Sequence, residues 1–233
     1  MPGSIATIRR LLRDRRGVAL LEFGYALPIV LGIGLYGVEI ANLAITNLRV
    51  SQVALNLADN ASRVGARTPS NTFQLREFDI AEVLAATRIH AQRLKLLENG
   101  RVILSSLEEE GGRQRIHWQR CIGLKGGTNY ISHYGATEVQ AGTAPSTSRT
   151  SPFYGTVTTG MGIPAVTAPT GSGVMFVEVN YEYQPLFGDW LVGKRRIHHT
   201  ASFIIRDRRD LTQLFLTAPS TPASRMTCDK YTL

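Results

Sequence analysis

One apolar run near the N-terminus constrains this chain more than any other feature. Residues 18–38 read VALLEFGYALPIVLGIGLYGV and contain one ionisable side chain, Glu22. As an α-helix rising about 1.5 Å per residue, this run extends roughly 30 Å, the thickness of a bilayer's hydrocarbon core. The rest of the 233 residues is polar and mixed in character. The sequence therefore predicts one membrane-spanning helix followed by a globular part.

The distribution of charge predicts the orientation of that helix. Residues 1–17 hold five arginines and Asp14, which supply +4 of the net charge of +8. Cytoplasmic flanks of membrane helices are enriched in Lys and Arg, so we expect the N-terminus in the cytoplasm and everything after Val38 outside it. No basic stripe interleaved with aromatic residues occurs in the sequence, and no nucleic-acid partner is expected.

The apolar run does not fit a cleaved secretory signal; a plain signal anchor fits it better but leaves one residue without an explanation. It exceeds the 7–15 apolar residues typical of a signal peptide, and no A-x-A-like site follows it. A plain anchor leaves Glu22 unexplained, because a carboxylate in hydrocarbon costs about 2–3 kcal/mol. Cleavage between Gly17 and Val18 would create an α-amino group one helical turn from Glu22. That amine could neutralise the carboxylate within one chain or between neighbouring chains, and so set the register of a helical stack.

The stretch RRG-VALLE-F combines a basic leader, a glycine, four apolar residues, Glu22 and Phe23, and it resembles the processing site of type IV pilin-like proteins. With Pro28 and the sequel VEIANLAITNLRVSQVALNLADNASRVGA, residues 9–66 resemble the TadE-like (TadE/TadG) pseudopilins of the tight-adherence (Tad) pilus system. The segments VILSSLEEEGGRQRIHWQRC and the C-terminal strand region are similar less specifically. Val18 stands where classical type II secretion pseudopilins have Phe.

This resemblance implies a function and a set of partners. Leader 1–17 would be removed by a prepilin peptidase at Gly17 and Val18, and Glu22 with Phe23 would act in assembly and register. The protein would be a minor pseudopilin of Tad (Flp-type) pilus biogenesis in the bacterial inner membrane, with a periplasmic head and possible incorporation into an extracellular pilus. Its partners would be the membrane, other pilins and the assembly platform. The alternative is a signal-anchored periplasmic binding or adhesion domain that is not processed.

Glycines inside the span have two interpretations. GIGLYG at residues 32–37 matches the G-x-G-x-x-G pattern, but a dinucleotide loop needs a strand-to-helix turn facing water, and this motif lies at membrane depth. Small residues let membrane helices approach closely, so we expect Gly34, Gly37 and Ala41 to pack against other helices; lipid-facing filler is the alternative. Pro28 is expected to kink or loosen the helix.

The fold class expected for the whole chain is α+β, with a long pilin-like helix and a small head. The helix should continue as an amphipathic segment over residues 39–66, because apolar side chains recur every seven residues at Leu43, Val50, Leu57 and Val64. This stripe packs either on the chain's own head or against neighbouring helices.

The head, residues 67–233, is predicted to contain a second helix and an antiparallel sheet. The helix is expected over residues 79–100, with a capping-box-like start at Asp79. Strands are expected at 101–108, 114–121, 174–185 and 196–207, the first two joined by a turn at 109–113. Residues 123–173, which hold ten Gly, ten Thr and four Pro, are expected to form an extended, mobile surface excursion. That excursion would contact partners or be a variable loop.

The two cysteines and five histidines are the candidates for covalent and metal chemistry. In an exported domain Cys121 and Cys228 predict one disulfide; two unpaired buried thiols are the alternative in cytosol. No histidine pair shows zinc-ligand spacing, and His198 and His199 should point to opposite faces of a strand. No nucleophile elbow or phosphate-binding loop occurs. We therefore expect no catalytic residue, metal site, cofactor or small-molecule substrate, and no enzyme.

Overall fold

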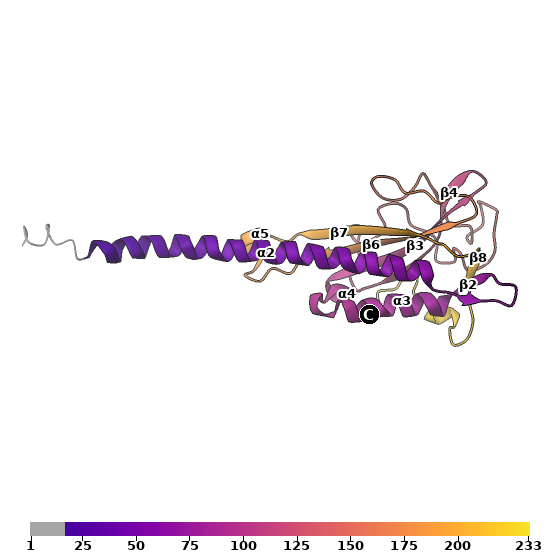
Figure 1. Ribbon diagram of the computed structural model, residues 1–233, viewed down its shortest axis with the longest axis horizontal. Coiled ribbons are helices and arrows are strands. Elements are labelled where there is room, and N and C mark those ends of the chain that lie inside the picture. Colours follow the sequence, from indigo (N-terminus) through magenta and orange to yellow (C-terminus); the bar gives the residue numbers. More distant parts are fainter. Residues whose placement is uncertain (1–16) are drawn as a thin grey trace, which may run out of the picture. The chain divides into compact units, whose positions relative to one another are not determined.

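The computed structural model of the chain describes residues 17–233, without the side chain of His90. These residues belong to two compact units. One joins the chain up to Ala44 with residues 184–193, and the other contains residues 45–183 and 194–233. The fold is α+β, with a long apolar N-terminal helix and a small head that contains a sheet, as predicted (Figure 1).

The first helix, α2 (Val18–Arg63), is continuous over 46 residues, or about 70 Å. The predicted continuation of the apolar helix beyond residue 38 is confirmed, but the helix ends at Arg63 and not at residue 66, which belongs to a strand; Pro28 lies inside the helix. Its later turns pack within the second unit, where the buried side chains include Val50, Ala54, Leu57 and Ala61. Arg209 donates hydrogen bonds to the carbonyls of Ala61 and Ser62 and so attaches the end of α2 to the head.

A five-stranded antiparallel sheet forms the centre of the head, in the order β5-β4-β3-β6-β7 (Figure 1). The strands are β3 (Gly100–Glu110), β4 (Arg113–Ile122), β5 (Thr156–Thr158), β6 (Gly173–Glu182) and β7 (Arg196–Ile204). The predicted hairpin between β3 and β4 is confirmed, and its turn is made by Gly111 and Gly112 with φ of 58° and 76°. Glycine suits this turn because it adopts positive φ without a Cβ clash.

Strand β6 shows how the sequence builds a sheet with two buried faces. Alternate side chains of β6 are all buried, at Met175, Val177, Val179 and Tyr181, as is Tyr183 just after the strand. The Tyr181 hydroxyl donates to the Leu94 carbonyl, so this face is the one covered by helical residues. The opposite face carries Phe176 and Glu178, which are also buried. Both faces therefore need a covering layer.

Residues 123–173 have little regular structure, and they cover the second face of the sheet, a packing role that the sequence did not predict. Their strand β5 pairs with β4, and four of their side chains are buried at Ala141, Tyr154, Met161 and Ala168. Met161 and Ala168 pack with Leu107, Ile116 and Phe176 in a hydrophobic cluster. The many Gly and Pro residues allow the turns with which this irregular segment follows the sheet closely. From composition alone, the same residues suggest a flexible loop.

The second helix also differs from the prediction. One helix was expected over 79–100, whereas the structure has α3 (Glu77–His90), a 3₁₀ turn η1 (Gln92–Leu94) and α4 (Leu96–Asn99). The break follows from Lys95, whose φ of 48° is left-handed and cannot continue a helix. Asp79 is the third helical residue and accepts a hydrogen bond from the backbone N–H of Arg76, so the helix starts earlier than predicted.

A second small sheet was not foreseen. Strands β1 (Ala66–Arg67), β2 (Phe73–Arg76) and β8 (Arg209–Phe215) form it, and β2 pairs with β8 in parallel. This pairing joins segments more than 130 residues apart, for which local periodicity provides no signal. Strands β1 and β2 lie between the end of α2 and the start of α3 in the sequence, whereas β8 follows β7 near the C-terminus.

Candidate functional site

The predicted processing and assembly residues lie at the start of α2. Gly17 is in a turn, and its carbonyl accepts a hydrogen bond from the N–H of Leu21, 3.2 Å away. Val18 is the first helical residue, and Glu22 and Phe23 are exposed on the first two turns. The leader residues 1–16 lie outside the described residues. The structure therefore brings Gly17, Val18, Glu22 and Phe23 together on one exposed helix end.

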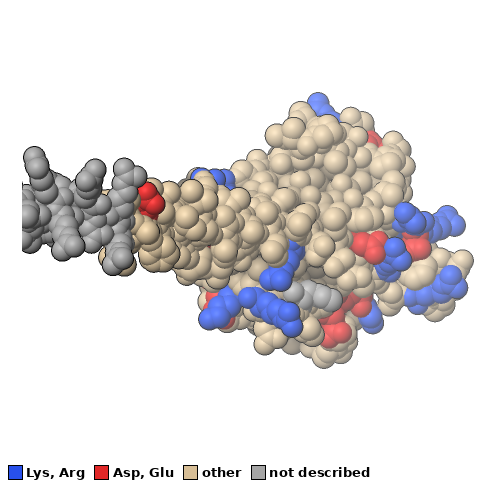
Figure 2. All heavy atoms as spheres, turned by 60° about the vertical axis from the view of Figure 1, so that its left-hand side comes forward, with Lys and Arg blue, Asp and Glu red and all other residues tan. Residues whose placement is uncertain are grey.

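The first half of α2 presents an apolar surface without cover from the described chain. Every residue from 17 to 38 is exposed, and Leu20 and Tyr25 are 77% and 76% exposed. Figure 2 shows few charged side chains along this part of α2 and many on the head. The helix is long and apolar enough to cross a membrane, judged by length and composition. Exposed apolar surface of this extent marks contact with lipid or with other proteins.

The residues expected to pack with neighbouring helices are accessible. A Cβ placed on Gly34 or Gly37 would meet no atom of the described chain within 4 Å. Ala41, one turn beyond Gly37, is exposed as well. These positions are open to an approaching helix, although nothing in the described chain occupies them.

A polar contact missed by sequence reasoning lies directly after the apolar run. Glu39 is fully buried, and its carboxylate accepts hydrogen bonds from the backbone N–H groups of Leu186 and Phe187, at 3.0 and 3.1 Å. Both belong to the segment 184–193, which connects β6 and β7 and contains the short helix α5 (Asp189–Val192). Trp190 on α5 is 74% exposed and donates from its indole N–H to the Phe187 carbonyl. An exposed tryptophan is thus held beside the end of the apolar run.

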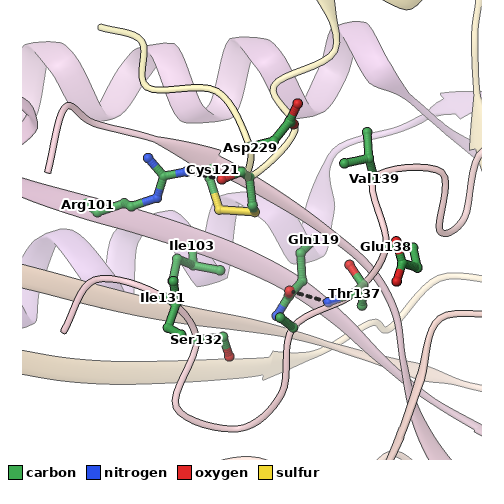
Figure 3. A pocket seen from close by; sticks show the side chains of 12 residues that line it. Arg101, Ile103, Gln119, Cys121, Ile131, Ser132, Thr137, Glu138, Val139 and Asp229 are labelled. Carbon is green, nitrogen blue, oxygen red and sulfur yellow. Dashed lines mark hydrogen bonds between the residues drawn. A yellow bond between two sulfur atoms is a disulfide. The ribbon is translucent and has the colours of Figure 1, made fainter. Parts of the chain in front are cut away.

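Cys121 and Cys228 form the predicted disulfide. Arg101 secures the same C-terminal segment, because its guanidinium donates to the carbonyls of Gly123, Cys228 and Lys230. The disulfide and Arg101 also line a pocket of about 210 Å³, closed on another side by residues 131–139 (Figure 3). Gln119 reaches across it and accepts a hydrogen bond from the N–H of Thr137. The residues that line this pocket therefore also make the contacts that hold the C-terminal segment and residues 131–139 in place.

Ser132, at the rim of this pocket, leads to a cluster of ionisable side chains that sequence reasoning missed. Its hydroxyl donates to the carboxylate of Glu178, which lies on β6 and is fully buried. Nδ1 of His133 lies 3.6 Å from Oε2 of Glu178, and Nε2 of His198, on β7, lies 3.8 Å from the same oxygen. The two imidazole rings are 4.5 Å apart between centroids. Two histidines and a carboxylate therefore converge.

The electrostatic surroundings of this cluster are mixed. Burial lowers the pKa of His133, and the adjacent His198 and Arg196 lower it further, whereas Glu178 acts in the opposite direction. A guanidinium nitrogen of Arg196 lies 3.1 Å from Nε2 of His133. Nε2 of His198 is buried and has no hydrogen-bond partner among the described residues. The cluster thus contains a buried carboxylate and an imidazole nitrogen, Nε2 of His198, that makes no hydrogen bond within the described residues.

Strand register is the signal that could have located part of this cluster. His198 pairs with Asn180, so it shares a sheet face with Glu178 two residues along, while His199 pairs with Val179 on the other face. His133 comes from the irregular layer, 45 residues before Glu178, and no spacing motif connects the three.

Comparison with protein-family models, with curated proteins and with solved structures finds no match to this chain. The residues and geometry described above define its class: an α+β protein with an exposed apolar N-terminal helix and a disulfide-linked head.

Proposed function

We propose that the protein is a minor pseudopilin that acts in Tad pilus biogenesis. Its apolar helix half would cross the bacterial inner membrane once, with the N-terminus in the cytoplasm and the head in the periplasm. A prepilin peptidase would cut between Gly17 and Val18. The observation that carries the proposal is an exposed apolar helix that begins at Val18 and has one acid, Glu22, between residues 18 and 38.

The exposed apolar surface of α2 supports a location in the membrane, and it also supports packing against other helices. An apolar face this large is unfavourable in water, and its 21 residues match the hydrocarbon thickness. The segment 184–193 supports the same location, since aromatic residues such as Trp190 are enriched at membrane–water interfaces. The open positions at Gly34, Gly37 and Ala41 would let pilin-class helices approach during assembly.

Glu22 is the residue through which assembly would be controlled. It is exposed, so its carboxylate would face lipid or a neighbouring helix. Isolated in hydrocarbon, this charge costs about 2–3 kcal/mol, and a cation from another subunit would remove most of that cost. The α-amino group of a processed Val18 is such a cation. The disulfide supports an exported head, because disulfides persist in oxidising compartments.

Processing is tested by intact-mass analysis of the protein extracted from membranes of its native host. We expect a chain that begins at Val18. A full-length chain, in cells whose other prepilins are processed, would contradict the proposal and favour the unprocessed signal-anchored domain.

Assembly is tested by Glu22→Ala in the same host. We expect cleavage to continue, because the cleavage site is intact. We expect pilus assembly to fail, because the variant lacks the carboxylate that is proposed to set the register between subunits. Leu21→Ala is the matched control, since Leu21 is a neighbouring, 60% exposed residue without charge, and it should assemble normally. Counting surface pili by electron microscopy measures the outcome; normal piliation of the Glu22 variant would refute the register role.

A further inference from the structure

We propose that His133, Glu178 and His198 form a binding site for a divalent transition-metal ion, best suited to Zn²⁺. This site lies in the head and is independent of the proposed role of α2. Two imidazoles and one carboxylate are a common set of protein ligands for zinc, and a fourth position filled by water completes the coordination.

Distances between the ligand atoms are close to those that a zinc site requires. One ligand atom from each of the three residues lies within 4.8 Å of the others, and Oε2 of Glu178 is 3.6 and 3.8 Å from its two imidazole partners. Ligands at about 2.0–2.2 Å from a tetrahedral zinc lie roughly 3.3–3.5 Å apart. The two distances to Glu178 must shorten by a few tenths of an ångström, and the widest separation of 4.8 Å by roughly 1.3–1.5 Å, to complete the site.

The carboxylate is held in place before any ion arrives. Besides the Ser132 hydroxyl, the backbone N–H of His133 donates to Glu178, at 2.9 Å. These donors orient the carboxylate, as partners behind a metal ligand usually do. Both donors are neutral groups, and the distance of 3.8 Å from the carboxylate to Nε2 of His198 is too long for a hydrogen bond. A cation between these atoms would satisfy both groups.

Solvent can deliver an ion to this place. The side chains of His133 and His198 are 34% and 26% exposed, whereas Glu178 is fully buried. A cation would therefore approach past the imidazoles and meet the carboxylate last. The exposed histidines also leave a coordination position that faces water.

Arg196 opposes a cation at the same place. Its guanidinium donates to the Asn129 carbonyl and lies beside Nε2 of His133. Binding through Nδ1 places the imidazole proton on Nε2, so Arg196 must move away from that nitrogen. The side chain is exposed and can do so at low cost. Replacing it by Gln should tighten metal binding, since a like charge is removed.

The test is metal titration of the full-length protein in detergent micelles, carrying an affinity tag without histidine and stripped with a chelator. Zn²⁺ is followed by isothermal titration calorimetry and Co²⁺ by its visible absorption. We expect one ion per chain and a Co²⁺ spectrum of tetrahedral intensity. His133→Gln and His198→Gln should each weaken Zn²⁺ binding at least tenfold, and Arg196→Gln should strengthen it. His199→Gln, one residue along on the other sheet face, should bind as the unaltered protein does.

Several results would overturn the site. Binding weaker than millimolar, the same affinity in both histidine variants, or weaker binding by Arg196→Gln would each do so. Circular dichroism and the intact disulfide establish that a variant is folded. The thermal midpoint supplies a second readout: at one fixed Zn²⁺ concentration, the ion should raise the midpoint of the unaltered protein and of His199→Gln equally, and that of His198→Gln by less. A rise of equal size in His198→Gln would also reject the site.

Discussion

At the scale of single residues, a buried ion pair connects α3 to the sheet. Nε and Nη2 of Arg120, on β4, donate to the two carboxylate oxygens of Glu77, at 2.9 and 2.5 Å. Both side chains are at most 3% exposed. Nε of Arg225 lies 3.1 Å from the same carboxylate, so the C-terminal segment shares this charge. Removing one partner of such a pair leaves an uncompensated charge in the interior.

We therefore expect Glu77→Ala to lower the free energy of unfolding of the head by about 3–5 kcal/mol. Asp59→Ala is the matched control, because it breaks an exposed pair with Arg63 and should cost about 0.5 kcal/mol or less. Urea denaturation followed by near-ultraviolet circular dichroism measures both. Equal losses in the two variants would be incompatible with a buried pair that stabilises the head.

Residue contacts could be predicted where composition leaves one choice. The disulfide was predicted because two cysteines allow a single pairing, and Glu22 was singled out as the one acid in the apolar run. The partners of Glu77 and Glu178 could not be predicted, because they lie 43 and 45 residues away from them in the sequence, at Arg120 and His133. Only the folded sheet brings such residues together.

At the scale of elements, the four long strands were predicted from their local sequence, and α2 from the apolar run over 18–38 and the heptad spacing that follows it. The break at Lys95 was missed because the apolar pattern continues through it. The packing of residues 123–173 on the sheet was not predicted because their buried side chains are few and irregularly spaced. The parallel pair of β2 and β8 depends on a contact that no local pattern encodes.

The ion pair of Lys125 and Glu182 joins the segment after β4 to the end of β6. Hydrogen bonding to Lys125 lowers the pKa of Glu182 below 4.5, and the same contact raises the pKa of Lys125 above 10.5. The stabilisation is therefore present between these limits and lost as the pH falls through the Glu182 pKa or rises through that of Lys125.

Lys125→Met should lower the free energy of unfolding by about 0.5–1 kcal/mol at neutral pH, since the pair is partly exposed. At a pH well below the Glu182 pKa the difference from the unaltered protein should vanish. Urea denaturation at both pH values measures this. A difference that does not depend on pH would mean that the lysine stabilises through packing of its alkyl chain.

The proposed membrane location predicts the depth of Trp190, in segment 184–193, within the bilayer. The chain has two tryptophans, Trp118, which is 2% exposed, and Trp190. In Trp118→Phe, reconstituted in vesicles, Trp190 fluorescence should be quenched more by lipids brominated near the headgroup than by lipids brominated near the chain ends. Trp190→Phe, which keeps Trp118, should show little quenching by either. Equal quenching of the two single-tryptophan proteins would contradict an interfacial Trp190.

At the scale of the whole molecule, the disulfide crosses 107 positions of sequence. In the chain-entropy description a loop of this length stabilises the folded state by about 4–5 kcal/mol. Cys121→Ser/Cys228→Ser should lower the free energy of unfolding by about that amount, measured by urea denaturation without reductant. Arg101 should keep the C-terminal segment attached in the folded variant. An undiminished stability would show that this segment is secured without the covalent bond.

The position of the two cysteines has a consequence for export. Cys121 and Cys228 can join only when both have reached the same oxidising side, with everything between them. On the proposed topology, a chain halted partway through the translocation channel keeps two thiols, and one that has passed beyond residue 228 can lose them. The oxidation state of Cys121 and Cys228 would therefore report whether residue 228 has crossed the membrane.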